Sequence, residues 1–226
     1  MPRPILPSPM NPTVMPVLPI VRLVSVRARR HGPPLAREGE PIQPMNAAHP
    51  HALHASPAGW PGDIFSALKT ARVRQVAYVP DGGHAELIRA IHADPAMIGI
   101  PLTTEEEGVA LVSGAWLGGD RACLLMQSSG VGNCINMLSL VRNMGGPFLT
   151  FVTMRGEWGE FNPWQVPMGT GTPDAFRLMG VHVLRADRPE EVGPATAAGI
   201  RMAYEGGSAV AVLLAQQLIG AKVFVK

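Results

Sequence analysis

Three consecutive acidic residues, Glu105, Glu106 and Glu107, follow Thr103 and Thr104 at the predicted start of a helix. The spacing fits a capping box, in which threonine and glutamate side chains bond to free backbone N–H groups. Negative charge at a helix N-terminus is also favoured by the helix dipole. Consecutive helical residues point about 100° apart, so the three carboxylates cannot all face solvent equally. We expect one of them to point toward the ends of the neighbouring strands.

The stretch MQSSGVGNCIN, residues 126–136, has the form of a phosphate-binding turn between a strand and a helix. It lacks the lysine of a P-loop, and from Gly130 the sixth position of a dinucleotide fingerprint is Ile135. Gly130 and Gly132 still permit close backbone approach. The turn offers neutral hydrogen-bonding side chains, namely Gln127, Ser128, Ser129 and Asn133. The two serines can also cap the helix, so a tight turn without a ligand is an equal alternative.

A third stretch, MRGEWGEFNPWQVPMGTG at residues 154–171, is too long for an ordinary connection. It carries Arg155, Trp158, Trp164 and Gln165. Loops of this kind usually line or cover a binding site. The alternative is a structured surface loop that its tryptophans hold in place.

The segment Pro80-Asp81-Gly82-Gly83-His84 closes the first predicted strand. Its simplest interpretation is a turn with His84 near the start of a helix. In a cleft, the same histidine would titrate near neutral pH.

Short apolar strands alternate with helices from residue 60 onward. Strands are predicted at 75–80, 97–102, 122–127, 147–154, 181–184 and 209–215, and helices at 83–94, 103–119, 131–144 and 188–206. This alternation predicts a three-layer αβα fold with a mainly parallel sheet of about six strands. Ligands in such folds bind beyond the carboxyl ends of the strands. A site is therefore expected among the loops 80–84, 102–107, 127–133 and 154–169.

Length and composition exclude several classes of protein. The chain has 226 residues, enough for one substantial core, and its net charge of +2 gives no electrostatic case for nucleic-acid binding. Its two cysteines, Cys123 and Cys134, indicate neither a disulfide framework nor a cysteine-based metal site. The sequence contains no uninterrupted run of about 18 apolar residues, so no membrane-spanning helix is expected. A cytoplasmic protein is expected.

Residues 1–55 differ from the rest of the chain. Eleven of the 23 prolines fall in the first 45 residues, and no acidic residue precedes Glu38. Proline at this density blocks both helix and sheet hydrogen bonds, so we expect disorder. The alternatives are a targeting peptide, or a true start at Met45. Residues 56–226 are expected to form the folded domain.

Four stretches, in this order and spacing, resemble the sulfopyruvate decarboxylase alpha subunit and the related phosphonopyruvate decarboxylases. They are VPDGG, TTEEEGVALVSGAWLGG, LLMQSSGVGNCINMLSL and RGEWGEFNPWQVPMG. The resemblance covers about residues 60–226. It implies the pyrimidine-binding (Pyr) domain of a thiamine-diphosphate enzyme.

The resemblance also implies roles for individual residues. The QSSGVGN turn resembles the family loop that approaches the organic part of thiamine diphosphate. The implied cofactor contacts are Pro80, Asp81, Glu105, Gln127, Ser128, Ser129, Gly130, Gly132 and Asn133. In the family a glutamate lies nine residues before the glycine of a G-[Y/A]-x-[A/L] stretch. Here that glycine is Gly114, which favours Glu105 over Glu106 and Glu107. His84, Arg155 and Gln165 are candidate contacts for the substrate.

Glu105 is thereby implied to be the catalytic residue. A buried carboxylic acid resists ionisation, and in the family this one hydrogen-bonds N1′ of the aminopyrimidine. The cofactor then loses the proton at thiazolium C2, attacks the ketone of a small 2-oxoacid, and accepts the electrons released as CO2 leaves.

The second half of the cofactor site is not recognisable in this chain. Family enzymes bind the diphosphate through Mg²⁺ at a GDG motif, whereas residues 118–120 read GGD. The resemblance therefore implies a separate beta subunit that carries the diphosphate-binding (PP) domain and the Mg²⁺, in a hetero-oligomer.

Gln165-Val166 replaces the QH pair expected in phosphonopyruvate decarboxylases. This replacement favours sulfopyruvate as substrate, with phosphonopyruvate as the alternative. A nucleotide- or acyl-binding regulatory module and a non-catalytic Pyr-like interaction domain are the rival hypotheses.

Overall fold

The computed structural model describes residues 58–220. The segment predicted to be disordered, residues 1–55, lies outside the described residues. Within them, no helix combines the length and apolar character needed to cross a bilayer.

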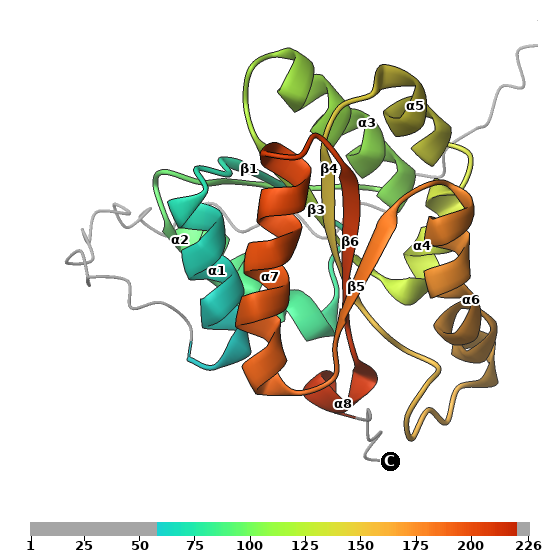
Figure 1. Cartoon of the computed structure of the whole chain (residues 1–226). Coiled ribbons are helices and arrows are strands. Elements are labelled where there is room, and N and C mark those ends of the chain that lie inside the picture. Colours follow the sequence, from blue (N-terminus) through green and yellow to red (C-terminus); the bar gives the residue numbers. More distant parts are fainter. Residues whose placement is uncertain (1–57, 221–226) are drawn as a thin grey trace, which may run out of the picture. The chain divides into compact units, whose positions relative to one another are not determined.

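The described residues form a parallel sheet with helices on both faces (Figure 1). The strands are β1 (Gln75–Tyr78), β2 (Ile98–Pro101), β3 (Ala122–Gln127), β4 (Phe148–Thr153), β5 (His182–Ala186) and β6 (Ala209–Leu214). The α-helices are α1 (Trp60–Thr70), α2 (Ala85–Ala93), α3 (Glu105–Leu117), α4 (Ser128–Cys134), α5 (Leu138–Met144), α6 (Val166–Leu178), α7 (Pro189–Tyr204) and α8 (Gln216–Ile219). Two 3-10 turns, η1 (Gly82–His84) and η2 (Pro163–Gln165), complete the elements.

The strand order is β2-β1-β3-β4-β6-β5, and every pairing is parallel. The predicted three-layer fold with about six strands is thus confirmed. Strand β1 lies between β2 and β3, and in this register Gln75 lies opposite Ile98 of β2 and Ala122 of β3.

Alternate residues of the buried strands supply two separate hydrophobic cores. In β3, Cys123 and Leu125 belong to the core under α1, α2 and α7, whereas Leu124 and Met126 belong to the core under α3 to α6. Side chains of successive strand residues point to opposite faces, so a strand covered on both sides must be apolar throughout. This requirement explains why β3 reads as a continuous apolar run.

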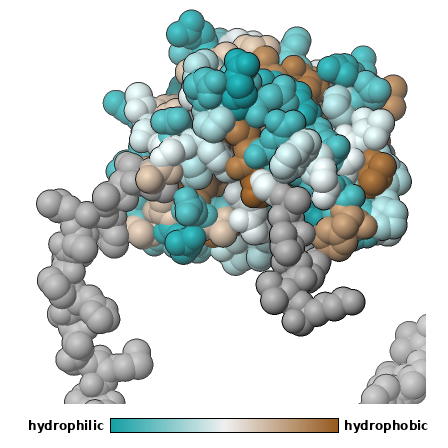
Figure 2. Space-filling view, turned by 90° about the horizontal axis from the view of Figure 1, so that it is seen from below, coloured by the Kyte–Doolittle hydropathy of each residue, from teal (hydrophilic) through white to brown (hydrophobic). Residues whose placement is uncertain are grey.

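The strand order reverses between β1 and β3. The chain leaves β1 through α2 to the edge strand β2, then returns through α3 to β3 on the other side of β1. The carboxyl ends of β1 and β3 therefore bound the crevice where open α/β sheets bind ligands. Seen from this end, the surface is mostly hydrophilic, with apolar residues in separate patches (Figure 2).

The predicted single helix at 131–144 was wrong. Helix α4 begins at Ser128, and α5 begins only at Leu138. The helix is interrupted around Asn136, whose carbonyl oxygen accepts hydrogen bonds from Ser139 N (3.1 Å) and Ser139 Oγ (2.6 Å). Serine side chains that bond nearby carbonyls compete in this way with helix continuation.

Two more boundaries differ from the sequence prediction. Helix α6 begins at Val166, inside the segment 154–169 that was expected to be a loop. Helix α1 was not predicted; its N-cap residue Gly59 and Pro61 in its first turn are residues typical of loops. Proline is tolerated at this place because the first helical N–H groups have no intrahelical partner.

Candidate active site

Glu105 is the first residue of α3, and its carboxylate turns toward α4. The predicted capping box does not form, because the N-cap residue Thr104 makes no side-chain cap bond. Instead Glu107 Oε2 accepts a hydrogen bond from Thr103 N at 2.9 Å. Glu106 and Glu107 are exposed, whereas Glu105 is half-buried. The expectation that one of the three glutamates faces the strand ends therefore points to Glu105.

Gly130 of α4 provides the space that the Glu105 side chain fills. A Cβ at position 130 would collide with the Cγ, Cδ and Oε1 atoms of Glu105. One turn further along α4, Asn133 Nδ2 donates a hydrogen bond to Glu105 Oε2 at 2.9 Å. The glycine-rich turn thus holds a carboxylate from another helix.

A pocket of about 520 Å³ opens at this contact. Its lining residues are Glu105, Ser129, Gly130, Asn133, Trp164, Pro167 and Met168. They supply one carboxylate, one amide and one hydroxyl, set among apolar walls, and no lysine or arginine. This chemistry suits a small planar ring with a few hydrogen-bonding atoms better than a phosphate group.

A line of side-chain hydrogen bonds joins the sheet to this pocket. Asp81 Oδ2 accepts from Thr153 Oγ1 (2.6 Å) and from Gly83 N (3.1 Å), and Asp81 Oδ1 accepts from Gln127 Nε2 (3.0 Å). Ser129 Oγ then donates to Gln127 Oε1 at 2.9 Å. Asp81 and Gln127, both expected to contact the cofactor, are thus bonded within the protein and support Ser129.

Pro80 and His84, from the segment that follows β1, do not line the pocket. Pro80 is exposed. His84 is fully buried, and its Nε2 lies 3.3 Å from the Phe151 carbonyl oxygen. Burial lowers the pKa of His84, against an opposing effect of Asp81, so the neutral ring is favoured. A substrate contact by His84 stays a prediction, which its full burial does not support.

Ser128 does not cap α4 as predicted. Gln127 is the N-cap residue and makes no side-chain cap bond. Ser128 Oγ instead accepts a hydrogen bond from Arg155 N at 3.1 Å, which ties α4 to the end of β4. Gly132 faces Met168 of α6, since a Cβ there would lie 3.6 Å from its sulfur.

Arg155 forms a buried ion pair rather than lining the pocket. Its Nε lies 2.6 Å from Glu160 Oε2, and the two side chains are 8% and 3% exposed. A second bond, from Arg155 Nη2 to Glu160 Oε1 at 2.8 Å, makes the pair bidentate. Hydrogen bonding from Arg155 lowers the pKa of Glu160 to about 2. Gln165 is half-buried and is not among the lining residues, and its substrate contact, like that of Arg155, stays a prediction.

Sequence reasoning missed two residues that line the pocket, Pro167 and Met168, and named Trp164 only as part of a loop expected to line or cover a site. Trp164 lies in η2, and Pro167 and Met168 follow it by three and four residues in the first turn of α6, a spacing that favours one side of a helix. This spacing was present but unused, because residues 154–169 were expected to form a loop. Among residues 58–220, no group of three or more His, Cys, Asp or Glu side chains is placed to hold a metal.

Two solved structures share the fold at low sequence identity. One is a 2-oxoglutarate:ferredoxin oxidoreductase from Magnetococcus marinus, at TM-score 0.55 and 13% identity over 71% of this chain and 29% of that one. The other, described as a thiamin diphosphate-dependent enzyme from Mycobacterium smegmatis, matches at TM-score 0.58 and 15% identity over 75% of this chain and 34% of that one. This chain thus spans about a third of each. The chain therefore shares its fold with a part of each of these enzymes.

Curated relatives narrow the class. The sulfopyruvate decarboxylase subunit alpha of Methanothermobacter thermautotrophicus is 32% identical over 67% of this chain and 92% of its own length. That of Methanococcus maripaludis is 33% identical over 67% of this chain and 91% of its own length. A phosphonopyruvate decarboxylase from Streptomyces viridochromogenes is 36% identical, over 60% of this chain and 35% of its own. No family model matches. The chain belongs to the sulfopyruvate decarboxylase alpha-subunit family.

Proposed function

We propose that this chain is the Pyr-domain subunit of a thiamine-diphosphate-dependent decarboxylase that converts sulfopyruvate to sulfoacetaldehyde and CO2. The observation that carries the proposal is the half-buried Glu105 carboxylate, held by Asn133 against Gly130 at a pocket. Membership of the alpha-subunit family supports the substrate and the need for a partner subunit.

The pocket fits the aminopyrimidine end of the cofactor. Gly130 leaves room for a carboxylate where any other residue would displace it. The lining presents Glu105, Asn133 and Ser129 as hydrogen-bonding groups, while Trp164 and Met168 supply apolar surface. A diphosphate needs positive charge, and the lining supplies none. We therefore place the diphosphate and its Mg²⁺ on a PP-domain beta subunit.

Each pocket residue has a distinct task in this proposal. Glu105 would hold the ring through a hydrogen bond to N1′ and share a proton with it. Asn133 occupies Glu105 Oε2 and so fixes which oxygen is available. Ser129 would face the ring edge, with its direction set by Gln127. Trp164 and Met168 would limit the access of water. When bound, thiamine diphosphate supplies the nucleophilic carbon and the electron sink for decarboxylation.

A second candidate substrate is phosphonopyruvate. The observation in its favour is the 36% identity to the Streptomyces phosphonopyruvate decarboxylase. This chain covers only about a third of that enzyme, whereas it covers nearly all of the sulfopyruvate decarboxylase alpha subunits. Sulfopyruvate is therefore the preferred substrate.

Reconstitution tests the proposal. The full chain, its PP-domain partner, thiamine diphosphate and Mg²⁺ are mixed, and CO2 release is measured with sulfopyruvate and with phosphonopyruvate. We expect release only with both subunits present, and a higher kcat/KM for sulfopyruvate. Tight cofactor binding by the isolated chain would contradict the shared site. Binding of the partner without CO2 release from either acid would favour a non-catalytic interaction domain.

A further inference from the structure

The segment between β4 and α6, residues 156–165, closes on itself, and we name it the aromatic loop. Gly156 has φ +80°, and a Cβ there would collide with the backbone carbonyl of Gln165. The two ends of the loop are therefore in backbone contact. Loops whose ends meet in this way hold their shape through their own side chains and frequently carry function.

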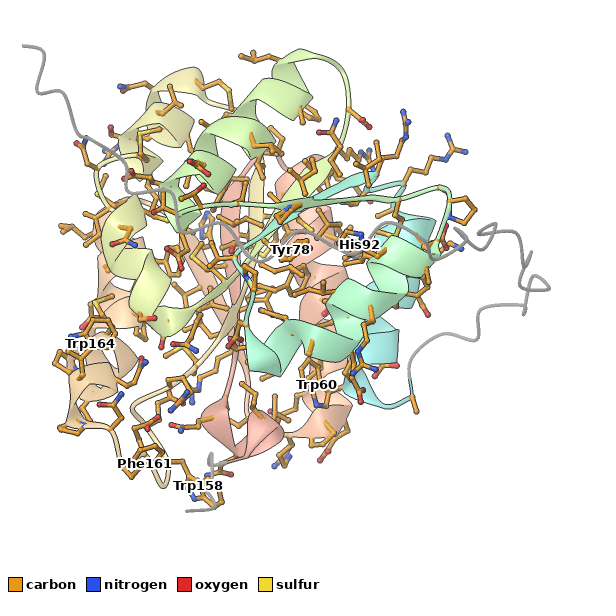
Figure 3. All side chains as sticks on the ribbon, turned by 180° about the vertical axis from the view of Figure 1, so that it is seen from behind. Trp60, Tyr78, His92, Trp158, Phe161 and Trp164 are labelled. Carbon is orange, nitrogen blue, oxygen red and sulfur yellow. The ribbon has the colours of Figure 1, made fainter. Side chains whose placement is uncertain are left out.

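Three aromatic side chains project from this loop. Trp158 is 50% exposed, Phe161 55% and Trp164 72% (Figure 3). Trp164 also lines the pocket that contains Glu105. The conformation of the aromatic loop therefore decides where one wall of the pocket lies.

A buried glutamine from the far end of the chain holds the start of this loop. Gln216, on α8, is 1% exposed. Its Oε1 accepts hydrogen bonds from Glu157 N at 2.9 Å and from Trp158 N at 3.0 Å. Its Nε2 donates to Glu160 Oε2 at 3.0 Å. One side chain thus satisfies two backbone donors and one carboxylate of the loop.

From Glu160 the hydrogen bonds continue to the pocket wall. Glu160 Oε1 accepts from Asn162 N at 3.1 Å, and Asn162 Oδ1 accepts from Trp164 N at 3.2 Å. Gln216, Glu160, Asn162 and Trp164 therefore form one continuous line. The bidentate pair with Arg155 fixes Glu160 from its other side.

We propose that Gln216 is a positioning residue of the candidate active site, acting through Glu160 and Asn162. It sets the aromatic loop so that Trp164 stands as the pocket wall near Glu105 and bounds the space proposed for the aminopyrimidine. This inference rests on the proposed function. Gln216 does not line the pocket, so its effect on the reaction must travel through the loop.

Limited proteolysis of the full chain measures the loop directly. Chymotrypsin cuts after aromatic residues, and mass spectrometry assigns the cuts to Trp158, Phe161 and Trp164. We expect Gln216→Leu to speed cleavage on the order of tenfold, the factor expected when one or two hydrogen bonds are lost. The matched control is Gln75→Leu, which removes a similar glutamine–carboxylate bond, to Asp120, at the amino end of the strands. Cleavage of this control at the aromatic loop should match that of the parental chain.

Kinetics of the reconstituted enzyme supply a second readout. We expect Gln216→Leu to weaken the affinity of the reconstituted enzyme for thiamine diphosphate on the order of tenfold, with a smaller change in kcat at saturating cofactor. Asn162→Ala cuts the line between Glu160 and Trp164 without disturbing the buried ion pair. It should weaken cofactor affinity in the same direction and accelerate cleavage after Trp164, even if Gln216→Leu fails to fold.

Two results would overturn the inference. One is cleavage of the aromatic loop no faster in Gln216→Leu and Asn162→Ala than in Gln75→Leu. The other is a loss of kcat in both variants with no change in the affinity for thiamine diphosphate. A parental enzyme that releases no CO2 would refute the proposed function instead, while the proteolysis of the loop would still decide the role of Gln216.

Discussion

The carboxylate of Glu105 occupies the space left by the missing side chain of Gly130. The two residues lie on different helices, α3 and α4, which follow the carboxyl ends of β2 and β3 in the parallel sheet. A glycine of the apparent phosphate-binding turn therefore makes room for an acid. This contact explains why the turn carries glycines without the residues that grip pyrophosphate.

Replacing Gly130 by alanine should displace Glu105 without unfolding the chain. The added Cβ meets the outer atoms of a flexible, half-buried side chain, which can swing toward solvent. We expect the reconstituted enzyme to lose about 10²-fold or more in kcat/KM, the lower range for loss of acid–base assistance. Steady-state CO2 release checks this, with circular dichroism as the measure of folding.

Gly114→Ala is the matched control for this change. A Cβ at position 114 meets nothing within 4 Å. Alanine in a helix interior should stabilise the chain by about 0.5–1 kcal/mol and leave kcat/KM unchanged. Equal activity in the two alanine variants would show that the Glu105–Gly130 contact has no part in the reaction.

Asn133→Ala should release the Glu105 carboxylate from its hydrogen bond. A typical hydrogen bond contributes about 1 kcal/mol, so we expect a loss of roughly five- to tenfold in kcat/KM and little change in thermal stability. Asn136→Ala, three residues on and also exposed, serves as control. If both variants keep parental activity, Asn133 does not orient the acid.

The Arg155–Glu160 pair should make stability depend on pH in the acid range. The pKa of Glu160 in the folded chain is lowered from 4.5 to about 2, so the stabilisation is present above the unfolded pKa and is lost as the pH falls toward 2. The urea midpoint should therefore decrease between about pH 5 and about pH 3, and it should decrease more in the parental chain than in Glu160→Gln.

Glu205→Gln is the control for the pH experiment, because Glu205 is exposed and only weakly paired with Arg201 at 4.0 Å. It should keep the parental dependence on pH. An identical dependence in all three chains would remove the Arg155–Glu160 pair as the cause.

The sequence was sufficient for the sheet. An uninterrupted apolar run such as residues 122–126 is typical of a strand buried on both faces. The family offset from Gly114 favoured Glu105 among the three glutamates, and the structure places Glu105 at the pocket, while its catalytic role stays a prediction.

Contacts between residues far apart in the chain could not be predicted from the sequence. The bond between Asn133 and Glu105 joins residues 28 apart in the chain, and that between Gln216 and Glu160 joins residues 56 apart. Arg155 was predicted as a substrate contact, and nothing in the pattern shows that Glu160 folds back to pair with it. For His84 the sequence left a turn and a cleft open, because burial at a helix start depends on which face the turn presents.

Glu105 is proposed to act on the aminopyrimidine of thiamine diphosphate. The most direct test of this role is the rate of exchange of the cofactor's C2 proton for deuterium in the reconstituted two-subunit enzyme. Glu105→Gln is nearly isosteric and should keep the fold and the partner, but slow the exchange and the turnover by about 10²–10⁴-fold. Glu106→Gln and Glu107→Gln, at exposed positions, should exchange at the parental rate. Parental exchange in all three variants would contradict the account.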